Sequence, residues 1–165
     1  MDLAHLHLLI NHFPIVGTII GTFIMLFALM KKERNLQRAV LVLWVILAAL
    51  SPLVMSTGEE AEHKVEEMAG ISEDSIHEHE EAAEYAYWLM IGLGVISLAA
   101  LSLHKMGSEI LMATKISFVI SLFAATAMVR TGYLGGLIRH IEVPITTSPT
   151  QADAGVQESS QEETD

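Results

Sequence analysis

The sequence predicts an all-α integral membrane protein built as a four-helix bundle. Its 165 residues are 52% hydrophobic and only 18% charged, with a mean hydropathy of +0.45. This balance is typical of membrane proteins and not of soluble domains. The apolar residues form four long segments, and one bilayer crossing needs roughly 20 of them. We therefore expect a membrane domain over residues 1–143, with spans at 8–30, 39–56, 86–103 and 109–140.

The four spans differ in their local features. In the first, Gly17 and Gly21 are spaced four apart, which favours close packing against a neighbouring helix. The second contains Pro52, which removes one backbone hydrogen bond and is expected to kink the helix near its outer end. The third begins among aromatic residues at 85–88, a pattern typical of the membrane interface. The fourth stays apolar far enough to cross the bilayer.

Basic residues predict the orientation of the bundle. The short connection between the first two spans carries Lys31, Lys32, Arg34 and Arg38, and the connection between the last two contributes Lys105. The positive-inside rule places these connections in the cytoplasm, so both termini lie outside. We expect a multi-pass protein of the bacterial inner membrane, surrounded by lipid, with its termini on the periplasmic side.

The outer connection between spans two and three, residues 57–85, is strongly acidic. It holds eleven carboxylates against the single base Lys64. Helical spacing over 59–68 ends near Gly70, and Ser72 is a suitable N-cap for a helix that continues from Glu73 into the third span. The last 22 residues, 144–165, are polar and acidic and are predicted to be disordered. The net charge of −11 argues against binding to nucleic acid, and the absence of cysteine excludes thiolate metal sites.

The histidines gather at the predicted outer side. Seven of the eight map there, and only His104 maps inside. His12 precedes Phe13–Pro14 at the membrane edge, where a polar side chain must find a partner. Helix rise places His79 in about the same layer, so we expect His12 and His79 to share one ligand or metal. His5 and His7, close to the terminus, are expected to be exposed.

Residues near the outer end of the fourth span complete the candidate site. Arg130 has no acidic residue at its depth within any span, which favours an anionic ligand such as a haem propionate or a lipid phosphate; the alternative is an arginine at the membrane edge that extends toward water. The glycines of this end allow either a flat macrocycle or a neighbouring helix to approach the backbone. The further candidates for this site are His140, Gly132, Gly135 and Gly136.

These stretches resemble a family of small bacterial membrane proteins, the domain-of-unknown-function 2231 family, over about residues 5–143. The resemblance implies a four-helix fold and singles out His12, His79 and His140. The chain departs from the family pattern by a longer acidic connection. The matching pieces are His5, His12-Phe13-Pro14, Thr57-Gly58, His79, Gly132-Tyr133-Leu134-Gly135-Gly136 and Arg139-His140.

Three functions remain open from the sequence. The first is a b-type haem protein, or a haem-binding subunit, in an electron-transfer chain, with His12 and His79 as axial ligands. The second is a non-haem site for copper, zinc or iron, because Glu60 and His63 have Glu-x-x-His spacing and His77 follows Asp74 at the same spacing. The third is a non-catalytic subunit of a larger membrane complex or homo-oligomer. Its acidic connection would dock a basic soluble redox partner.

Overall fold

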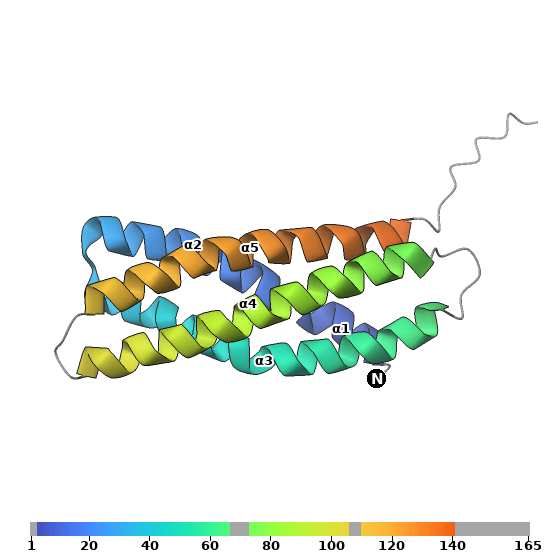
Figure 1. Ribbon diagram of the computed structural model, residues 1–165, viewed down its shortest axis with the longest axis horizontal. Coiled ribbons are helices and arrows are strands. Elements are labelled where there is room, and N and C mark those ends of the chain that lie inside the picture. The colour runs from blue at the N-terminus through green and yellow to red at the C-terminus, as the bar shows by residue number, and fades with distance from the viewer. Residues whose placement is uncertain (1–2, 67–72, 106–109, 141–165) are drawn as a thin grey trace, which may run out of the picture.

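The computed structural model describes residues 3–66, 73–105 and 110–140, and everything it describes is helical or in short turns (Figure 1). A short helix α1 (Leu3–Ile10) precedes α2 (His12–Lys31). The three remaining helices are longer, and they are α3 (Arg34–Glu66), α4 (Glu73–Lys105) and α5 (Ile110–His140). The expected all-α class and the count of four long apolar helices are confirmed. The predicted tail at 144–165, and the predicted helix end at Gly70 and cap at Ser72, lie outside the described residues.

All four long helical segments have the length and composition needed to cross a membrane. The candidate spans are His5–Lys31, Arg34–Glu62, Glu73–Leu103 and Met112–Ile138. Large apolar side chains point away from the bundle: Phe23 is 69% exposed and Phe123 is 61% exposed. An apolar outer surface of this kind is what lipid contact requires.

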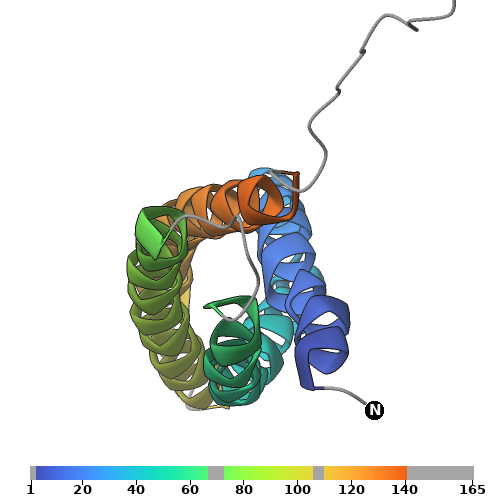
Figure 2. The ribbon, with the colours of Figure 1, turned by 90° about the vertical axis from the view of Figure 1, so that its right-hand side faces the viewer.

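The helices alternate in direction and surround a common axis (Figures 1 and 2). Viewed along that axis, α2 and α4 are diagonally opposite, and α3 and α5 form the other diagonal. One end of the bundle contains α1, the end of α3, the start of α4 and the end of α5. We call it the histidine end, because His7 and His79 lie there. The opposite end carries the exposed turn at Lys32.

The core is tightly packed where the helices cross. Trp44 and Met25 are fully buried between α2 and α3. A Cβ atom added to Gly21 would lie 2.8 Å from Nε1 of Trp44, and one added to Gly17 would lie 2.8 Å from a methyl group of Leu47. The predicted role of this glycine pair in close helix packing is confirmed.

The first span is interrupted at Asn11, where the sequence predicted one continuous helix over 8–30. Pro14 has no backbone N–H, so the carbonyl of Ile10 has no donor from residue i+4. The Asn11 N–H still donates to the His7 carbonyl at 2.9 Å. As a result α1 separates from α2 and packs mainly on α3.

Helix occupies most of the acidic connection, as its helical spacing predicted. The helical spacing predicted from Glu59 is the continuation of α3, which runs unbroken through Pro52 to Glu66. The predicted helix from Glu73 into the third span is confirmed as α4. At the histidine end α3 therefore continues past its candidate span to Glu66, while α4 and its candidate span both begin at Glu73.

Replacing Gly21 by alanine tests the packing of α2 on α3. The new methyl group would meet the rigid, fully buried ring of Trp44, and such overpacking costs about 1–3 kcal/mol. We expect a lower midpoint of thermal unfolding in detergent. Gly92→Ala is the matched control, because nothing lies within 4 Å of its Cβ position. Equal midpoints for the two variants would contradict this packing.

Candidate functional site

A cavity of about 650 Å³ opens at the histidine end. Its rim is formed by exposed residues that include His5, Glu59 and Glu80, and its floor is buried. Each of the helices α1 to α5 contributes residues to its wall, from the part that lies at the histidine end. The floor consists of Pro14, Ser51, Ala86 and Met128.

The described residues of the cavity wall offer several lone pairs. None of the described residues that line it is lysine or arginine, whereas Glu59, Glu62 and Glu80 are among them. The side-chain oxygen Oδ1 of Asn11 is buried and has no hydrogen-bond partner. A wall of this composition attracts a cation or a Lewis acid and repels a free anion.

His7 reaches the cavity from α1 and is half-buried. Its Nδ1 lies 3.1 Å from the carbonyl oxygen of Val54 and 3.3 Å from Oγ1 of Thr57, both on α3. A carbonyl oxygen can only accept, so Nδ1 must carry the proton and donate it. In the neutral ring, Nε2 is then left with a free lone pair.

His79 reaches the same cavity from α4 and is also half-buried. Its Nδ1 donates to the carbonyl oxygen of Thr131 on α5 at 3.1 Å. The Thr131 hydroxyl in turn lies 3.0 Å from the carbonyls of Ala82 and Ala127, which ties α5 to α4 beside the imidazole. His79 therefore has the same proton arrangement as His7. Both rings line the same cavity.

Each of these rings lies against a glycine of the helix that accepts its hydrogen bond. A Cβ atom at Gly58 would be 3.1 Å from Cε1 of His7, and one at Gly135 would be 2.9 Å from Cε1 of His79. A side chain at either position would push the ring away from its carbonyl partner. The sequence had suggested that Gly135 makes room for a macrocycle or a helix, and the structure places an imidazole ring there.

His12 lines the cavity but is exposed, and its Nδ1 is bonded within its own segment, to the carbonyl of Leu8 at 2.8 Å. The sequence expected His12 to share a ligand with His79 and expected His7 to be exposed. The structure half-buries His7 instead, because the break at Asn11 lets α1 pack against α3. The signal that could have found His7 is the His-x-His pattern at 5–7, which recurs at 77–79.

The other predicted site residues are distributed around the cavity. Gly132 and Gly136 line it, and nothing lies within 4 Å of the Cβ position of Gly136. Arg130 is exposed and is not part of the wall. The helix backbone includes His63 and His140, whose side chains lie outside the described part of the structure.

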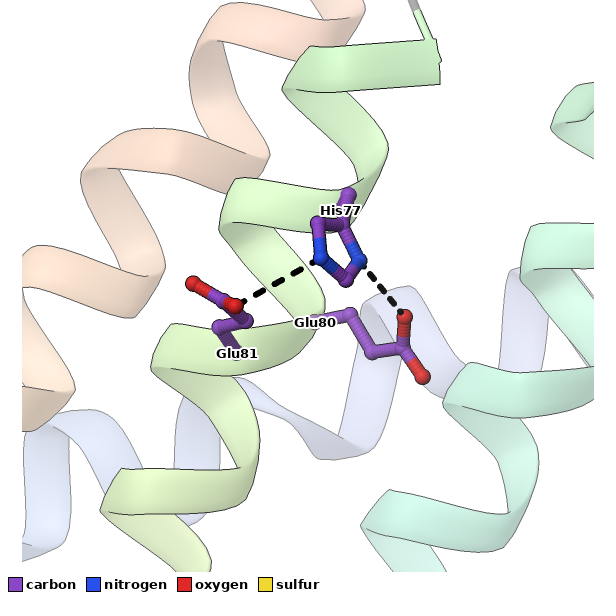
Figure 3. A network of polar contacts seen from close by, with 3 residues as sticks. All are labelled: His77, Glu80 and Glu81. Carbon is purple, nitrogen blue, oxygen red and sulfur yellow. Dashed lines mark ion pairs between the residues drawn. The ribbon is translucent and has the colours of Figure 1, made fainter.

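The candidate residues for a His/carboxylate metal site are not clustered. His77 is exposed on α4 and pairs with two glutamates of the same helix (Figure 3). Its Nδ1 lies 3.6 Å from Oε2 of Glu80, and its Nε2 lies 3.4 Å from Oε1 of Glu81. Glu60 is exposed on α3. Among the side chains that the structure describes, no group of three or more histidine, aspartate or glutamate residues is arranged to hold a metal ion.

Comparison with known proteins adds no assignment, since no family model, curated protein or solved structure matches this chain.

Proposed function

We propose that the protein binds a metal centre between the neutral imidazoles of His7 and His79, and that this centre is a b-type haem that takes part in electron transfer. One observation carries the proposal. Both rings line one cavity, and both donate Nδ1–H to a backbone carbonyl, which leaves Nε2 available for coordination.

The hydrogen bonds support this assignment because they match what a metal-bound histidine needs. A ligating imidazole is neutral, and its other ring N–H usually donates to a carbonyl or carboxylate that fixes the tautomer and the ring orientation. Axial ligation of a b-type haem by two such imidazoles from different helices requires no fixed spacing in sequence.

The shape of the cavity also supports a macrocycle. Its volume of about 650 Å³ lies within the roughly 300–1,000 Å³ of typical cofactor sites. The floor is mostly apolar, and Gly132 and Gly136 leave part of the α5 wall without side chains, beside Met128, Thr131 and Ile138. No lysine or arginine of the described part lines the cavity, and Arg130, which the sequence favoured as a partner for a haem propionate, is exposed outside the wall. A bound haem would supply reversible one-electron transfer.

A single non-haem metal ion is the second candidate, favoured by the excess of acceptors. The unpartnered oxygen of Asn11 and the rim carboxylates Glu59 and Glu80 are harder ligands than imidazole and line the same cavity as the two rings, although they do not form a ready-made cluster with them. Copper, zinc and iron all accept such mixed ligands. Elemental analysis of the purified protein, together with a pyridine haemochrome assay, separates the two candidates.

We further propose that the histidine end faces the periplasm of a bacterial inner membrane, with both termini outside. The exposed bases Lys31, Lys32 and Arg34 at the other end support this orientation through the positive-inside rule. We also propose that the protein is a member of the domain-of-unknown-function 2231 family. We propose further that it assembles with other membrane subunits or with further copies of itself. A basic redox partner would dock on the acidic ends of its helices.

Alanine variants of the two buried histidines test the site. We expect His7→Ala and His79→Ala each to lose the Soret band of the purified protein, because one axial ligand and its orienting hydrogen bond are removed together. His104→Ala is the control at the opposite end. His12→Ala should retain most of the haem, since its ring is exposed and bonded locally. Full haem content in His7→Ala would rule out this pair of ligands.

The orientation is tested with reporter fusions. A periplasm-active reporter inserted within 67–72 should be active, and the same reporter placed after Lys32 should be inactive. A cytoplasm-active reporter should give the reverse pattern. Activity on the opposite sides would overturn the orientation while leaving the bundle itself unaffected.

A further inference from the structure

The buried faces of α2 and α4 repeat each other. Every buried residue of α2 has a buried counterpart 72 positions later, and α4 buries no other residue between Ala86 and Leu103. The chemistry of the side chains differs within most pairs, so the repeat lies in the packing and not in residue identity. The pairs are Pro14/Ala86, Thr18/Met90, Gly21/Leu93, Thr22/Gly94, Met25/Ser97 and Ala28/Ala100.

The helices α3 and α5 repeat each other in the same way, at a separation of 77 positions. The separation is five positions larger because 14 positions separate Ala100 from Thr114, whereas 9 separate their counterparts Ala28 and Gln37. Five pairs of positions are buried in both helices, namely Gln37/Thr114, Val40/Ser117, Trp44/Ser121, Leu47/Ala124 and Ser51/Met128.

The arrangement of the helices turns this repeat into an approximate two-fold symmetry. The two helices of each pair run in the same direction and are diagonally opposite in the ring (Figure 2). The counterparts Thr18 and Met90 meet at the centre, where Oγ1 of Thr18 donates to Sδ of Met90 at 3.4 Å. Two equivalent residues can touch only where the axis passes between them. The axis therefore runs along the middle of the bundle.

The cavity lies on the same axis. His7 and His79 are 72 positions apart, whereas their carbonyl partners Val54 and Thr131 are 77 apart. Gly58 and Gly135 are also 77 apart, so each glycine stands four residues after the carbonyl that binds the ring. The same separations relate twenty-two of the twenty-six lining residues as eleven pairs.

We infer that the two halves of the chain each supply one equivalent ligand unit, and that Gly58 and Gly135 are the residues that position the two imidazoles. In a helix the carbonyl of residue i already accepts the N–H of residue i+4. A ring that donates to this carbonyl must pass over residue i+4, and glycine is the residue that leaves the space. The contacts of 3.1 Å and 2.9 Å at the two Cβ positions show that the space is filled by the rings.

This symmetry indicates which class of metal centre suits the site, an inference that rests on the proposed function. Two equivalent imidazoles facing one axis suit a centre with two equivalent and opposed coordination positions. The two axial positions of a metalloporphyrin meet this requirement. An ion that also used the rim carboxylates would break this equivalence, because the counterparts of Glu59 and Glu80 are Gly136 and Leu8.

Nitrogen NMR of the full-length protein in detergent, labelled with ¹⁵N-histidine and free of hemin, tests the two units. Signals of the two rings are assigned by their loss in His7→Gln and His79→Gln. In the wild type we expect both rings to carry the proton on Nδ1. Gly135→Ala should shift the His79 ring alone and Gly58→Ala the His7 ring alone, while Gly92→Ala, with nothing within 4 Å, should shift neither.

Hemin titration of the same variants supplies the second readout. Loss of the orientation of one ligand typically costs about 10- to 100-fold in affinity, so both glycine variants should weaken hemin binding by a similar factor. An unshifted His79 ring in Gly135→Ala, or equal shifts of both rings in either variant, would overturn the positioning role. If Gly135→Ala does not fold, Gly58→Ala carries the test, because its contact is looser. If hemin binds to no form, the proposed function falls, and the NMR result alone decides whether the two units exist.

Discussion

The hydrogen bonds from two imidazole rings to backbone carbonyls are the interactions on which the histidine end depends. A polar ring among apolar helices is costly unless its N–H has a partner, and here the partner is the main chain of the next helix. The bond from His7 to Val54 ties α1 to α3, and the bond from His79 to Thr131 ties α4 to α5. Both bonds also fix which nitrogen is left for chemistry. The same two hydrogen bonds thus hold the helices together and orient the imidazoles for coordination.

The two halves are equivalent in packing but not in the way each histidine is delivered. In the second half, α4 is continuous, so His79 stands on the same helix as the apolar residues that follow it. In the first half, Pro14 stands where α4 has Ala86, and the helix breaks three residues earlier at Asn11. His7 is therefore delivered by a separate short helix that leans on α3. The rim is unequal as well, since Glu80 is the counterpart of Leu8, so one side of the mouth is more acidic.

Much of the fold could be predicted from the sequence because the bilayer imposes long apolar helices. The number of spans, the glycine packing of α2 and the helix from Glu73 all follow from local patterns. The break at Asn11 was missed because a proline at the start of a helix is ordinarily tolerated, and only the packing of α1 on α3 shows its effect. Arg130 is exposed for a comparable reason: its depth was predictable from helix rise, but its face depends on how α5 packs.

The candidate site was harder to predict than the fold. The sequence located the correct end of the bundle and included His79, because histidines and glycines concentrate there. It paired His79 with His12, since a histidine next to Phe13–Pro14 at a membrane edge needs a partner. The burial of His7 depends on a contact with Val54, 47 residues away, and the internal repeat is visible only once the buried positions are known.

Anomalous X-ray diffraction from crystals of the metal- or haem-loaded protein would show whether His7 and His79 hold a metal, because it distinguishes the metal from the lighter atoms of the protein. We expect a single peak on the approximate two-fold axis, about 2.0–2.1 Å from Nε2 of both His7 and His79, as is usual for metal–imidazole bonds. A peak bonded to His12, or one at the exposed Glu60 and His77 surfaces with none between the two buried rings, would contradict this expectation.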